Sequence, residues 1–164
     1  LDGLALQWAY RHRNLRTVVL RPCNVIGPDI QNAISRYLRQ DRVGAVMGFD
    51  PMWQFIHQTD MVSAIVQAYE SRAVGVYNVA GLGAMPFQTA LKLTDAKLWR
   101  FPAPLATAML KVAGRIAPTL PAYLVDFCKY PVVISDDHFR KDVGFVPQIG
   151  LRESILSTVH KPLS

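Results

Sequence analysis

The chain has 164 residues, of which 51% are hydrophobic and 18% are charged. This length and composition allow a sizeable core and exclude a disordered, collagen-like or repeat protein, because glycine and proline are scattered singly. The eighteen basic and twelve acidic residues give a net charge of +6, which raises the question of a nucleic-acid or anionic-membrane partner.

The basic residues fall into small groups. Arg11, Arg13 and Arg16 lie close together, and Arg36, Arg39 and Arg42 recur at every third position. No recognition module and no long basic run accompanies them, so we interpret both groups as solvated helix ends. We therefore expect no nucleic-acid and no membrane partner. Binding of an anion by the first group is the alternative.

The two cysteines, Cys23 and Cys128, are far apart and form no Cys-x-x-Cys pair. This spacing makes a zinc site or a disulfide framework an unfavourable interpretation. The longest uncharged run, residues 73–91, is interrupted by glycines and a proline, which is typical of strand, turn and loop rather than a membrane span. We expect a cytoplasmic protein without a bound metal.

The chain opens with an apolar stripe at helical spacing, made of Leu1, Leu4, Ala5 and Trp8, which predicts a helix over about residues 1–13. A chain that starts inside a helix suggests a piece of something longer. The run Thr17-Val18-Val19-Leu20 shows no alternation, as expected of a buried parallel strand.

Residues 21–28, Arg21-Pro22-Cys23-Asn24-Val25-Ile26-Gly27-Pro28, contain two prolines and a glycine, so we predict an extended, irregular loop. In an open α/β sheet, ligands bind just past the carboxyl ends of the strands. This loop is therefore a candidate binding segment.

Further elements follow in alternation. We predict a helix with Ile30, Ile34, Tyr37 and Leu38 on one face, strands at 43–49 and 55–57, a helix capped by Asp60 with Met61, Ala64, Ile65 and Ala68 buried, and a strand at 75–81. Alternating strands and helices are typical of a parallel sheet. His57 and Asp60 could form an acid/base pair, although a structural role is the favoured interpretation.

The last third of the chain has a different pattern. Prolines surround one predicted helix, with Leu105 and Ile116 on its apolar face, in a segment at 97–129 that we interpret as a lid or second lobe. Asp136 or Ser135 is expected to cap a short helix, with Asp137 a surface charge, and a final amphipathic helix runs from about Leu151 to Val159.

Four stretches together resemble the extended short-chain dehydrogenases/reductases, the NAD-dependent epimerase/dehydratase family. They are residues 20–28, the run Gln54-Phe55-Ile56-His57-Gln58-Thr59-Asp60, the strand Val76-Tyr77-Asn78-Val79-Ala80-Gly81, and Asp142-Val143-Gly144-Phe145-Val146-Pro147. They occur in the family's order across nearly the whole chain. One departure is that Gln58 stands where the family usually has Val.

The resemblance implies an α/β fold: the C-terminal part of a Rossmann-type parallel sheet plus a small α/β substrate-binding lobe. We expect the last sheet elements at about 1–28 and 60–81, interleaved with the lobe at about 29–59 and 82–164. The family's catalytic Tyr-x-x-x-Lys pair and glycine-rich loop are absent, so we expect no catalytic residue here and a C-terminal half that does not catalyse by itself.

The resemblance also implies NAD or NADP as cofactor, bound mainly by the other half of the protein, with Pro22, Cys23, Asn24 and Val25 beside the nicotinamide. Asn24 can also offer its amide to a small-molecule substrate, and a turn-capping role for it is an equal alternative.

The family often carries an arginine for the sugar diphosphate where this chain has Trp53, and residues 48–52 supply no replacement cation. A pocket with Trp53, Phe101, Tyr123 and Phe127 would suit an uncharged hydroxyl or carbonyl compound better than a nucleotide sugar. The alternative is that these aromatic residues pack the core of the lobe.

The sequence thus predicts the substrate-binding portion of an NAD(P)-dependent oxidoreductase, epimerase or dehydratase. The alternative is a non-catalytic binding module derived from the same fold. Because the strand at 17–20 would normally lie between neighbours, we also expect self-association or pairing with the other half.

Overall fold

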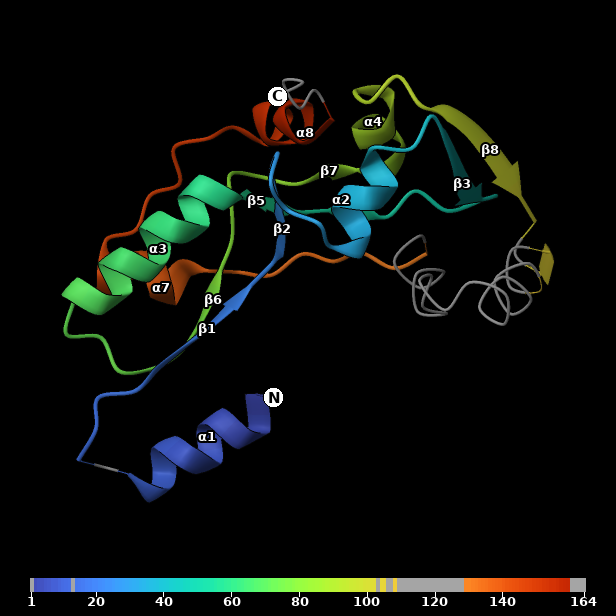
Figure 1. Cartoon of the computed structure of the whole chain (residues 1–164). Helices are drawn as coiled ribbons and strands as arrows, with labels where there is room; N and C mark the ends of the chain where they lie inside the picture. Colours follow the sequence, from blue (N-terminus) through green and yellow to red (C-terminus); the bar gives the residue numbers. More distant parts are fainter. Residues whose placement is uncertain (1, 13, 103, 106–107, 109–128, 160–164) are drawn as a thin grey trace.

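The computed structural model describes residues 2–12, 14–102, 104–105, 108 and 129–159. It is a mixed α/β structure, as the sequence predicts (Figure 1). The elements in chain order are α1 (Asp2–Arg11), β1 (Val18–Pro22), β2 (Asn24–Ile26), α2 (Ala33–Leu38), β3 (Arg42–Val46), β4 (Met52–Trp53), β5 (Phe55–His57), α3 (Gln58–Glu70), β6 (Gly75–Val79), β7 (Met85–Pro86), α4 (Phe87–Lys92), β8 (Lys97–Phe101), α7 (Asp137–Val143) and α8 (Leu151–Val159).

The strands pair mainly in parallel. β1 pairs with β6, β2 with β5, and β3 with β8, all parallel, whereas β4 and β7 are antiparallel. The described strands form four two-stranded sheets. Parallel partners require a crossover connection, and α3 supplies one between β1 and β6. The predicted parallel α/β arrangement is therefore confirmed.

Several elements differ from the predictions. The loop predicted at 21–28 contains β2, and the strand predicted at 43–49 ends at Val46. The short elements β4, β7 and α4 were not predicted, because two-residue strands and a six-residue helix leave almost no periodic pattern. β8 was also missed, since its sequence Lys-Leu-Trp-Arg-Phe does not alternate regularly and none of its five residues is fully buried. Most of the helix predicted at 105–116 lies outside the described residues.

Two hydrophobic clusters hold the fold together. One lies under β1 and β6 and contains Ile56, Ala64, Ala68, Tyr77, Val79, Phe139 and Phe145. The other contains Ile26, Ile34, Leu38, Val43, Trp53, Phe55, Phe87, Leu91 and Ile155. The second cluster joins α2, α4 and α8 around the short strands. The first cluster includes Phe139 and Phe145, so α7 and the residues after it pack against β1 and β6. From the sequence, these residues were expected in the substrate-binding lobe at about 82–164.

The start of α3 differs from the prediction. His57 is its N-cap, and the Nδ1 atom of His57 accepts a hydrogen bond from the backbone N–H of Thr59 at 3.2 Å. The predicted cap at Asp60 is therefore wrong, because that carboxylate binds the backbone near residue 148 instead. Ile65, which the pattern placed in the buried stripe, is 51% exposed.

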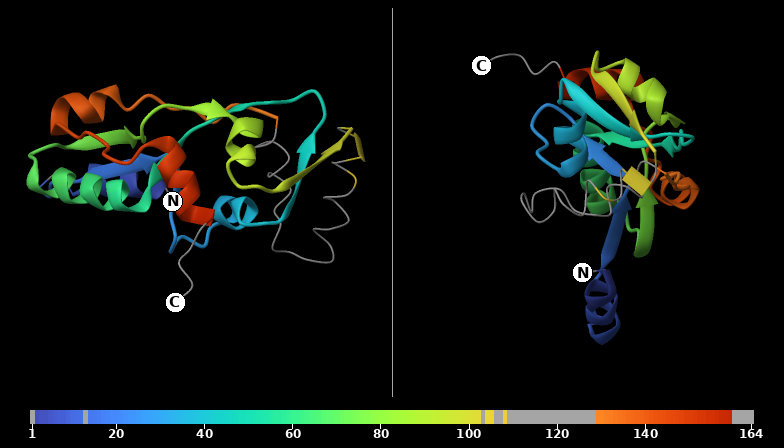
Figure 2. Two further views of the ribbon diagram at one scale, coloured as in Figure 1. Left: turned by 90° about the horizontal axis from the view of Figure 1, so that it is seen from above. Right: turned by 90° about the vertical axis from the view of Figure 1, so that its right-hand side faces the viewer.

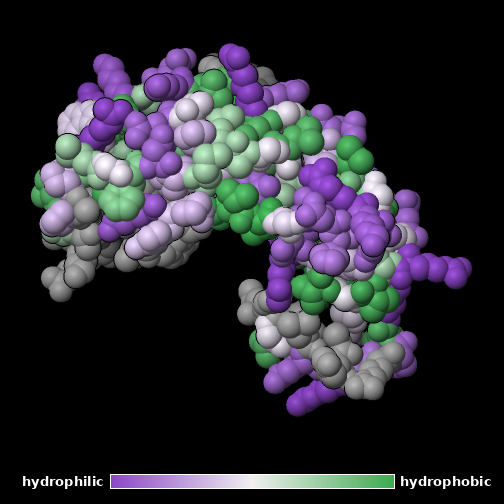
Figure 3. Space-filling view, turned by 180° about the vertical axis from the view of Figure 1, so that it is seen from behind, coloured by the Kyte–Doolittle hydropathy of each residue, from purple (hydrophilic) through white to green (hydrophobic). Residues whose placement is uncertain are grey.

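α1 lies apart from the rest of the molecule, beside the start of β1 (Figures 1 and 2). Its side chains Leu4 and Trp8 are exposed. From behind, hydrophobic side chains are visible on the outer surface (Figure 3). Within the described ranges, no helix combines the length and the hydropathy that a membrane-spanning segment needs.

Candidate functional site

The carboxyl ends of β1 and β6 lie side by side. Pro22 is in register with Val79, and the backbone N–H of Cys23 donates to the carbonyl of Val79 at 2.9 Å. The chain then enters β2, whose first residue, Asn24, is in register with Phe55 of β5. Residues 22–25 thus cross from one parallel pair to the next at a strand end, which is where open α/β sheets bind ligands.

Asn24 has an unused hydrogen-bond donor. Its Nδ2 atom is buried and has no hydrogen-bond partner in the part of the chain that the structure describes. A buried donor without an acceptor costs about 1–3 kcal/mol, and no turn-capping bond from Nδ2 to another described residue offsets this cost. The Oγ atom of Ser35 is the other buried atom without a partner among the described residues, but Ser35 lies on α2 and not at a strand end. Asn24 is therefore the side chain best prepared to receive an acceptor from a ligand.

Cys23 is a buried, unreactive thiol. The residue is 7% exposed, and its thiol is free. The pKa of the thiol is raised to about 11, chiefly by burial and to a smaller extent by the nearby Asp136 carboxylate, whereas a backbone hydrogen bond from Gly81 opposes the shift. A thiol with this pKa remains protonated at neutral pH and does not act as a nucleophile.

A segment at residues 132–136 crosses the strand ends and forms one wall of the site. The Oε1 atom of Gln54 accepts from the backbone N–H of Ile134 at 2.9 Å, and Asn78 donates to the carbonyl of Ser135 at 3.1 Å. These bonds join β6 and the residue before β5 to a part of the chain that is far away in sequence.

Asp136 completes this wall. Its Oδ2 atom accepts from the backbone N–H of Ala80 at 3.2 Å, and its Oδ1 atom binds Nε of Arg140 at 2.8 Å. The residue is the N-cap of α7 by position, but its side chain makes no capping bond. The predicted capping role of its side chain is therefore wrong, whereas Ser135 accepts from the N–H of Asp137. Asp136 instead holds the loop after β6, a role that the sequence pattern did not indicate.

Gly81 lets two backbone segments approach closely. A Cβ atom at this position would lie 2.2 Å from the carbonyl oxygen of Phe55. Real Cβ atoms do not approach backbone oxygens so closely, so any side chain would force β5 and the loop after β6 apart. The floor of the site therefore depends on glycine at this position.

His57 and Asp60 do not form an acid/base pair. His57 accepts from the N–H of Thr59, and Asp60 accepts from the N–H groups of Gln148 and Ile149. Burial lowers the pKa of His57, and the charges of Asp60 and Glu153 only partly oppose this shift. The favoured structural interpretation of both residues agrees with these bonds.

The structure describes two of the predicted aromatic pocket residues, Trp53 and Phe101. Trp53 is 1% exposed and packs against Phe55 and Phe87, with ring centroids 5.6 and 4.4 Å apart. Direct contact between Trp53 and a substrate would therefore require a neighbouring side chain to move. Phe101, at the end of β8, is half-buried. Tyr123 and Phe127 lie outside the described residues.

Two cations lie near the loop that precedes β4, although the sequence around Trp53 has none. Lys129 Nζ lies 6.0 Å from the centroid of the Phe49 ring. Arg100 donates to Oε1 of Gln88 at 2.7 Å, and the backbone N–H of Gln88 in turn donates to Asp50. Both cations come from segments distant in sequence, so only the fold could reveal them.

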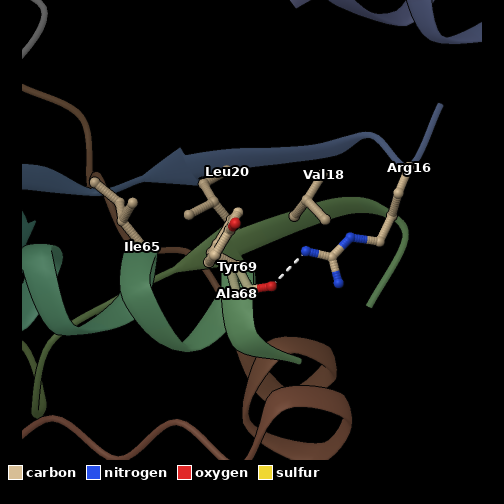
Figure 4. A pocket seen from close by; sticks show the side chains of 6 residues that line it. All are labelled: Arg16, Val18, Leu20, Ile65, Ala68 and Tyr69. Carbon is tan, nitrogen blue, oxygen red and sulfur yellow. Dashed lines mark hydrogen bonds between the residues drawn. The ribbon is translucent and has the colours of Figure 1, made fainter. Parts of the chain in front are cut away.

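A separate, apolar pocket of about 240 Å³ lies between β1 and α3. Val18 and Leu20 point from the strand toward Ile65 and Tyr69 of the helix, and Arg16 closes one end (Figure 4). Arg16 donates to the carbonyls of Tyr69 and Ser71 at the C-terminal end of α3 and so caps that helix end, a contact that the sequence did not predict. Among the described residues, no group of three or more His, Cys, Asp and Glu side chains is arranged to hold a metal ion.

Residues 2–80 match the family described as the NAD dependent epimerase/dehydratase family. The fold is similar to UDP-glucuronic acid 4-epimerase from Bacillus cereus in complex with UDP-glucuronic acid and NAD, with a TM-score of 0.71 and 13% identity over 98% of this chain and 49% of that one. It is also similar to RMD from Pseudomonas aeruginosa complexed with NADPH, with a TM-score of 0.67 and 18% identity over 98% and 52% of the two chains.

An uncharacterized protein of Mycobacterium tuberculosis, Rv0501, is 26% identical over 92 residues, which are 56% of this chain and 24% of that protein. The chain thus spans about half the length of these solved structures and about a quarter of that protein. The family resemblance, the fold class and the dinucleotide cofactor of the family that the sequence motifs predicted are confirmed.

Proposed function

Because residues 2–80 match the model of the NAD dependent epimerase/dehydratase family, we propose that this chain forms the substrate-binding portion of an NAD(P)-dependent oxidoreductase, epimerase or dehydratase. The protein acts on a hydroxyl or carbonyl group of a small molecule. The cofactor, when bound, supplies hydride transfer. The observation that carries the proposal is the buried, unpartnered Nδ2 atom of Asn24 at the carboxyl end of β1. The proposal includes a cytoplasmic location.

The residues of this chain would bind and orient ligands and would not transfer protons. Pro22 and Val25 form the backbone on either side of Asn24, and Cys23 is a protonated, buried neighbour. The Nδ2 donor fits an acceptor oxygen such as the carboxamide of a nicotinamide or the hydroxyl or carbonyl of a substrate. The wall at residues 132–136 would restrict access of water to this donor.

For the substrate, we favour an uncharged hydroxyl or carbonyl compound over a nucleotide sugar. The support is Trp53, a core residue at the position where relatives often carry a diphosphate-binding arginine. Lys129 and Arg100 lie near the same loop and are the feature that would favour an anionic substrate instead. Phe101, and Tyr123 from outside the described residues, complete the proposed lining.

The first experiment uses the intact protein that carries this chain. Binding of NADH and NADPH is measured by fluorescence, and turnover is followed with hydrophobic ketones and alcohols and with UDP-glucose. We expect cofactor binding and turnover of an uncharged compound. Turnover of UDP-glucose at ordinary efficiency would reject the substrate proposal, and failure to bind either dinucleotide would reject the function itself.

The residue-level test compares Asn24→Ala with Asn14→Ala, an exposed position in a turn. Loss of one hydrogen bond to a ligand corresponds to about a tenfold weaker affinity, so Asn24→Ala should weaken binding of NADH or of the substrate by about that factor. Its thermal stability should not decrease, because the donor has no hydrogen-bond partner among the described residues. Equal affinity in both variants would contradict the assignment.

We also propose that the apolar face of α3 is covered, either by further α/β structure of the same protein or by a second copy. Val62, Ile65, Val66 and Tyr69 recur at helical spacing and are each between 47% and 78% exposed. They lie next to the pocket between α3 and β1. Among the described strands, β1 pairs only with β6, so its other edge has no partner strand. Contiguous exposed apolar surface next to a free strand edge marks an association site.

Light scattering of residues 1–164 tests this proposal. We expect a dimer or larger species, and a monomer when Ile65 and Tyr69 are both replaced by Glu. Arg72→Glu, an exposed change just after α3, is the control and should leave the association unchanged. A stable, fully soluble monomer of the unaltered chain would reject self-association.

A further inference from the structure

Arg39 lies just after α2 and binds a set of backbone carbonyls. Its Nε atom donates to the carbonyl of Thr158 at 2.8 Å, Nη1 to that of Ile30 at 2.9 Å, and Nη2 to those of Gly27 and Pro28 at 2.9 Å each. Nη1 also lies 3.4 Å from Oε1 of Gln31. One side chain therefore joins the loop at residues 27–31 to the last turn of α8.

None of these acceptors is a carboxylate. The charge of Arg39 is balanced by carbonyl dipoles, and the carbonyl of Thr158 belongs to the negative end of the α8 dipole. Only a planar guanidinium with five N–H donors in a fixed fork can reach carbonyls on both sides at once. A lysine would keep the charge but could serve only part of this set.

A second side chain, Gln58 in the first turn of α3, holds the same loop. The N–H of Asp29 donates to Oε1 of Gln58 at 3.1 Å, and Nε2 of Gln58 donates to the Asp29 carboxylate at 2.9 Å. Gln58 packs directly over Gly27, where a Cβ atom would lie 2.4 Å from its Oε1. Gln58 is the departure from the family pattern noted in the sequence, and this pair gives it a structural role.

The loop leads directly out of β2, the strand that begins with Asn24. Asn32 closes the loop at its far end, donating from Nδ2 to the carbonyl of Val25 at 2.7 Å and accepting from the N–H of Ser35 at 2.8 Å. The position of β2, and therefore of the Asn24 side chain, depends on where this loop is held.

We propose that Arg39 is a positioning residue of the candidate site, which fixes Asn24 through the carbonyls of residues 27–30. It does not contact the ligand. The consequence for ligand binding rests on the proposed function, whereas the consequence for the conformation of Asn24 does not. Support of catalytic groups by a rigid surrounding shell has large effects, because small displacements of a donor weaken its hydrogen bond.

The experiment compares Arg39→Lys and Arg39→Met with Arg36→Lys, a matched change at an exposed position on α2. In the intact protein, amide hydrogen exchange is measured for residues 27–32, the NMR signal of the Asn24 side-chain amide is recorded, and NADH affinity is determined. We expect about tenfold faster exchange in the loop, a shifted Asn24 signal and about tenfold weaker binding in both Arg39 variants. Arg36→Lys should match the unaltered protein.

Each other outcome is decisive. An unchanged Asn24 signal in Arg39→Lys would overturn the proposal. The proposal would also be overturned if Asn24→Ala weakens NADH binding but the Arg39 variants, with faster exchange in the loop, bind NADH as tightly as the unaltered protein. If the unaltered protein binds neither dinucleotide, the proposed function fails, and the Asn24 signal alone decides the role of Arg39. Gln58→Val loosens the loop from the other side without touching Arg39. It should also shift the Asn24 signal, and the absence of that shift would overturn the coupling.

Discussion

The Asp60 carboxylate accepts hydrogen bonds from the backbone N–H of Ile149 at 3.0 Å and, with its other oxygen, from that of the preceding residue at 3.0 Å. Asp60 is 3% exposed in the first turn of α3, and Ile149 lies in the segment that enters α8. This carboxylate therefore fastens the start of α8, while Arg39 holds its end.

Replacing Asp60 by alanine is expected to lower the free energy of unfolding by about 2–3 kcal/mol, because two backbone donors lose a charged acceptor in a buried place. Urea denaturation measures the loss. Asp41→Ala, a change at an exposed aspartate, should alter stability by less than about 0.5 kcal/mol. Equal effects of the two substitutions would show that the carboxylate of Asp60 does not hold this segment.

The stability of the chain should decrease in mild acid because of His57. Burial lowers its pKa, so below about pH 6.5 the unfolded chain binds a proton that the folded chain does not bind. The stabilising contribution is complete above that range and is lost as the pH falls, when protonation of Nδ1 removes the cap on Thr59. Urea denaturation from about pH 7.5 to about pH 5.5 follows this loss.

His57→Asn is the control for the pH series, because asparagine caps helices without titrating in this range. The stability difference between the unaltered chain and this variant should shrink as the pH falls. The other described histidines, His12 and His138, are exposed and are present in both proteins. A difference that stays constant with pH would contradict the assigned pKa direction.

Gly81→Ala should destabilise the chain by about 2–3 kcal/mol, since the new methyl group would meet the carbonyl oxygen of Phe55, which belongs to a strand and cannot move aside. Thermal unfolding measures the change. Gly3→Ala in α1, where nothing lies within 4 Å, should be neutral or slightly stabilising. A stable Gly81→Ala variant would mean that the loop after β6 has room to shift.

The thiol of Cys23 should react slowly with iodoacetamide. With Cys128 replaced by Ser, Cys23 is the remaining cysteine, and its rate should rise about tenfold per pH unit until the pH approaches its pKa of about 11. Mass spectrometry follows the modification. A rate that levels off near pH 9.0, the ordinary value for a thiol, would show that the thiol is not held in the buried position.

The sequence predicted the parts of the fold that rest on local pattern. The helix stripes of α1, α7 and α8 and the apolar runs of β1 and β6 could be recognised because each pattern is complete within about ten residues. The candidate segment at Asn24 followed from the rule that ligands bind at strand ends.

The rest of the site depends on contacts between distant segments. Nothing near Asp136 indicates that its carboxylate binds Ala80, and nothing near Phe49 indicates that Lys129 lies over its ring. Ile65 was misplaced because α3 is apolar on two sides, so its periodicity could not tell which side faces the core. The same holds for Trp53, because the sequence alone cannot distinguish a large aromatic residue that lines a pocket from one that packs in the core.

The pairing of β1 with β6 also has a consequence for synthesis on the ribosome. Val18 is in register with Gly75, and Arg42 of β3 is in register with Lys97 of β8. The first strand of each parallel pair therefore has no partner until a segment more than fifty residues later has been translated. Contacts of such high sequence separation fold slowly. The emerging polypeptide therefore exposes the apolar run at β1 until α3 and β6 have left the exit tunnel, and during this interval the run is prone to aggregation.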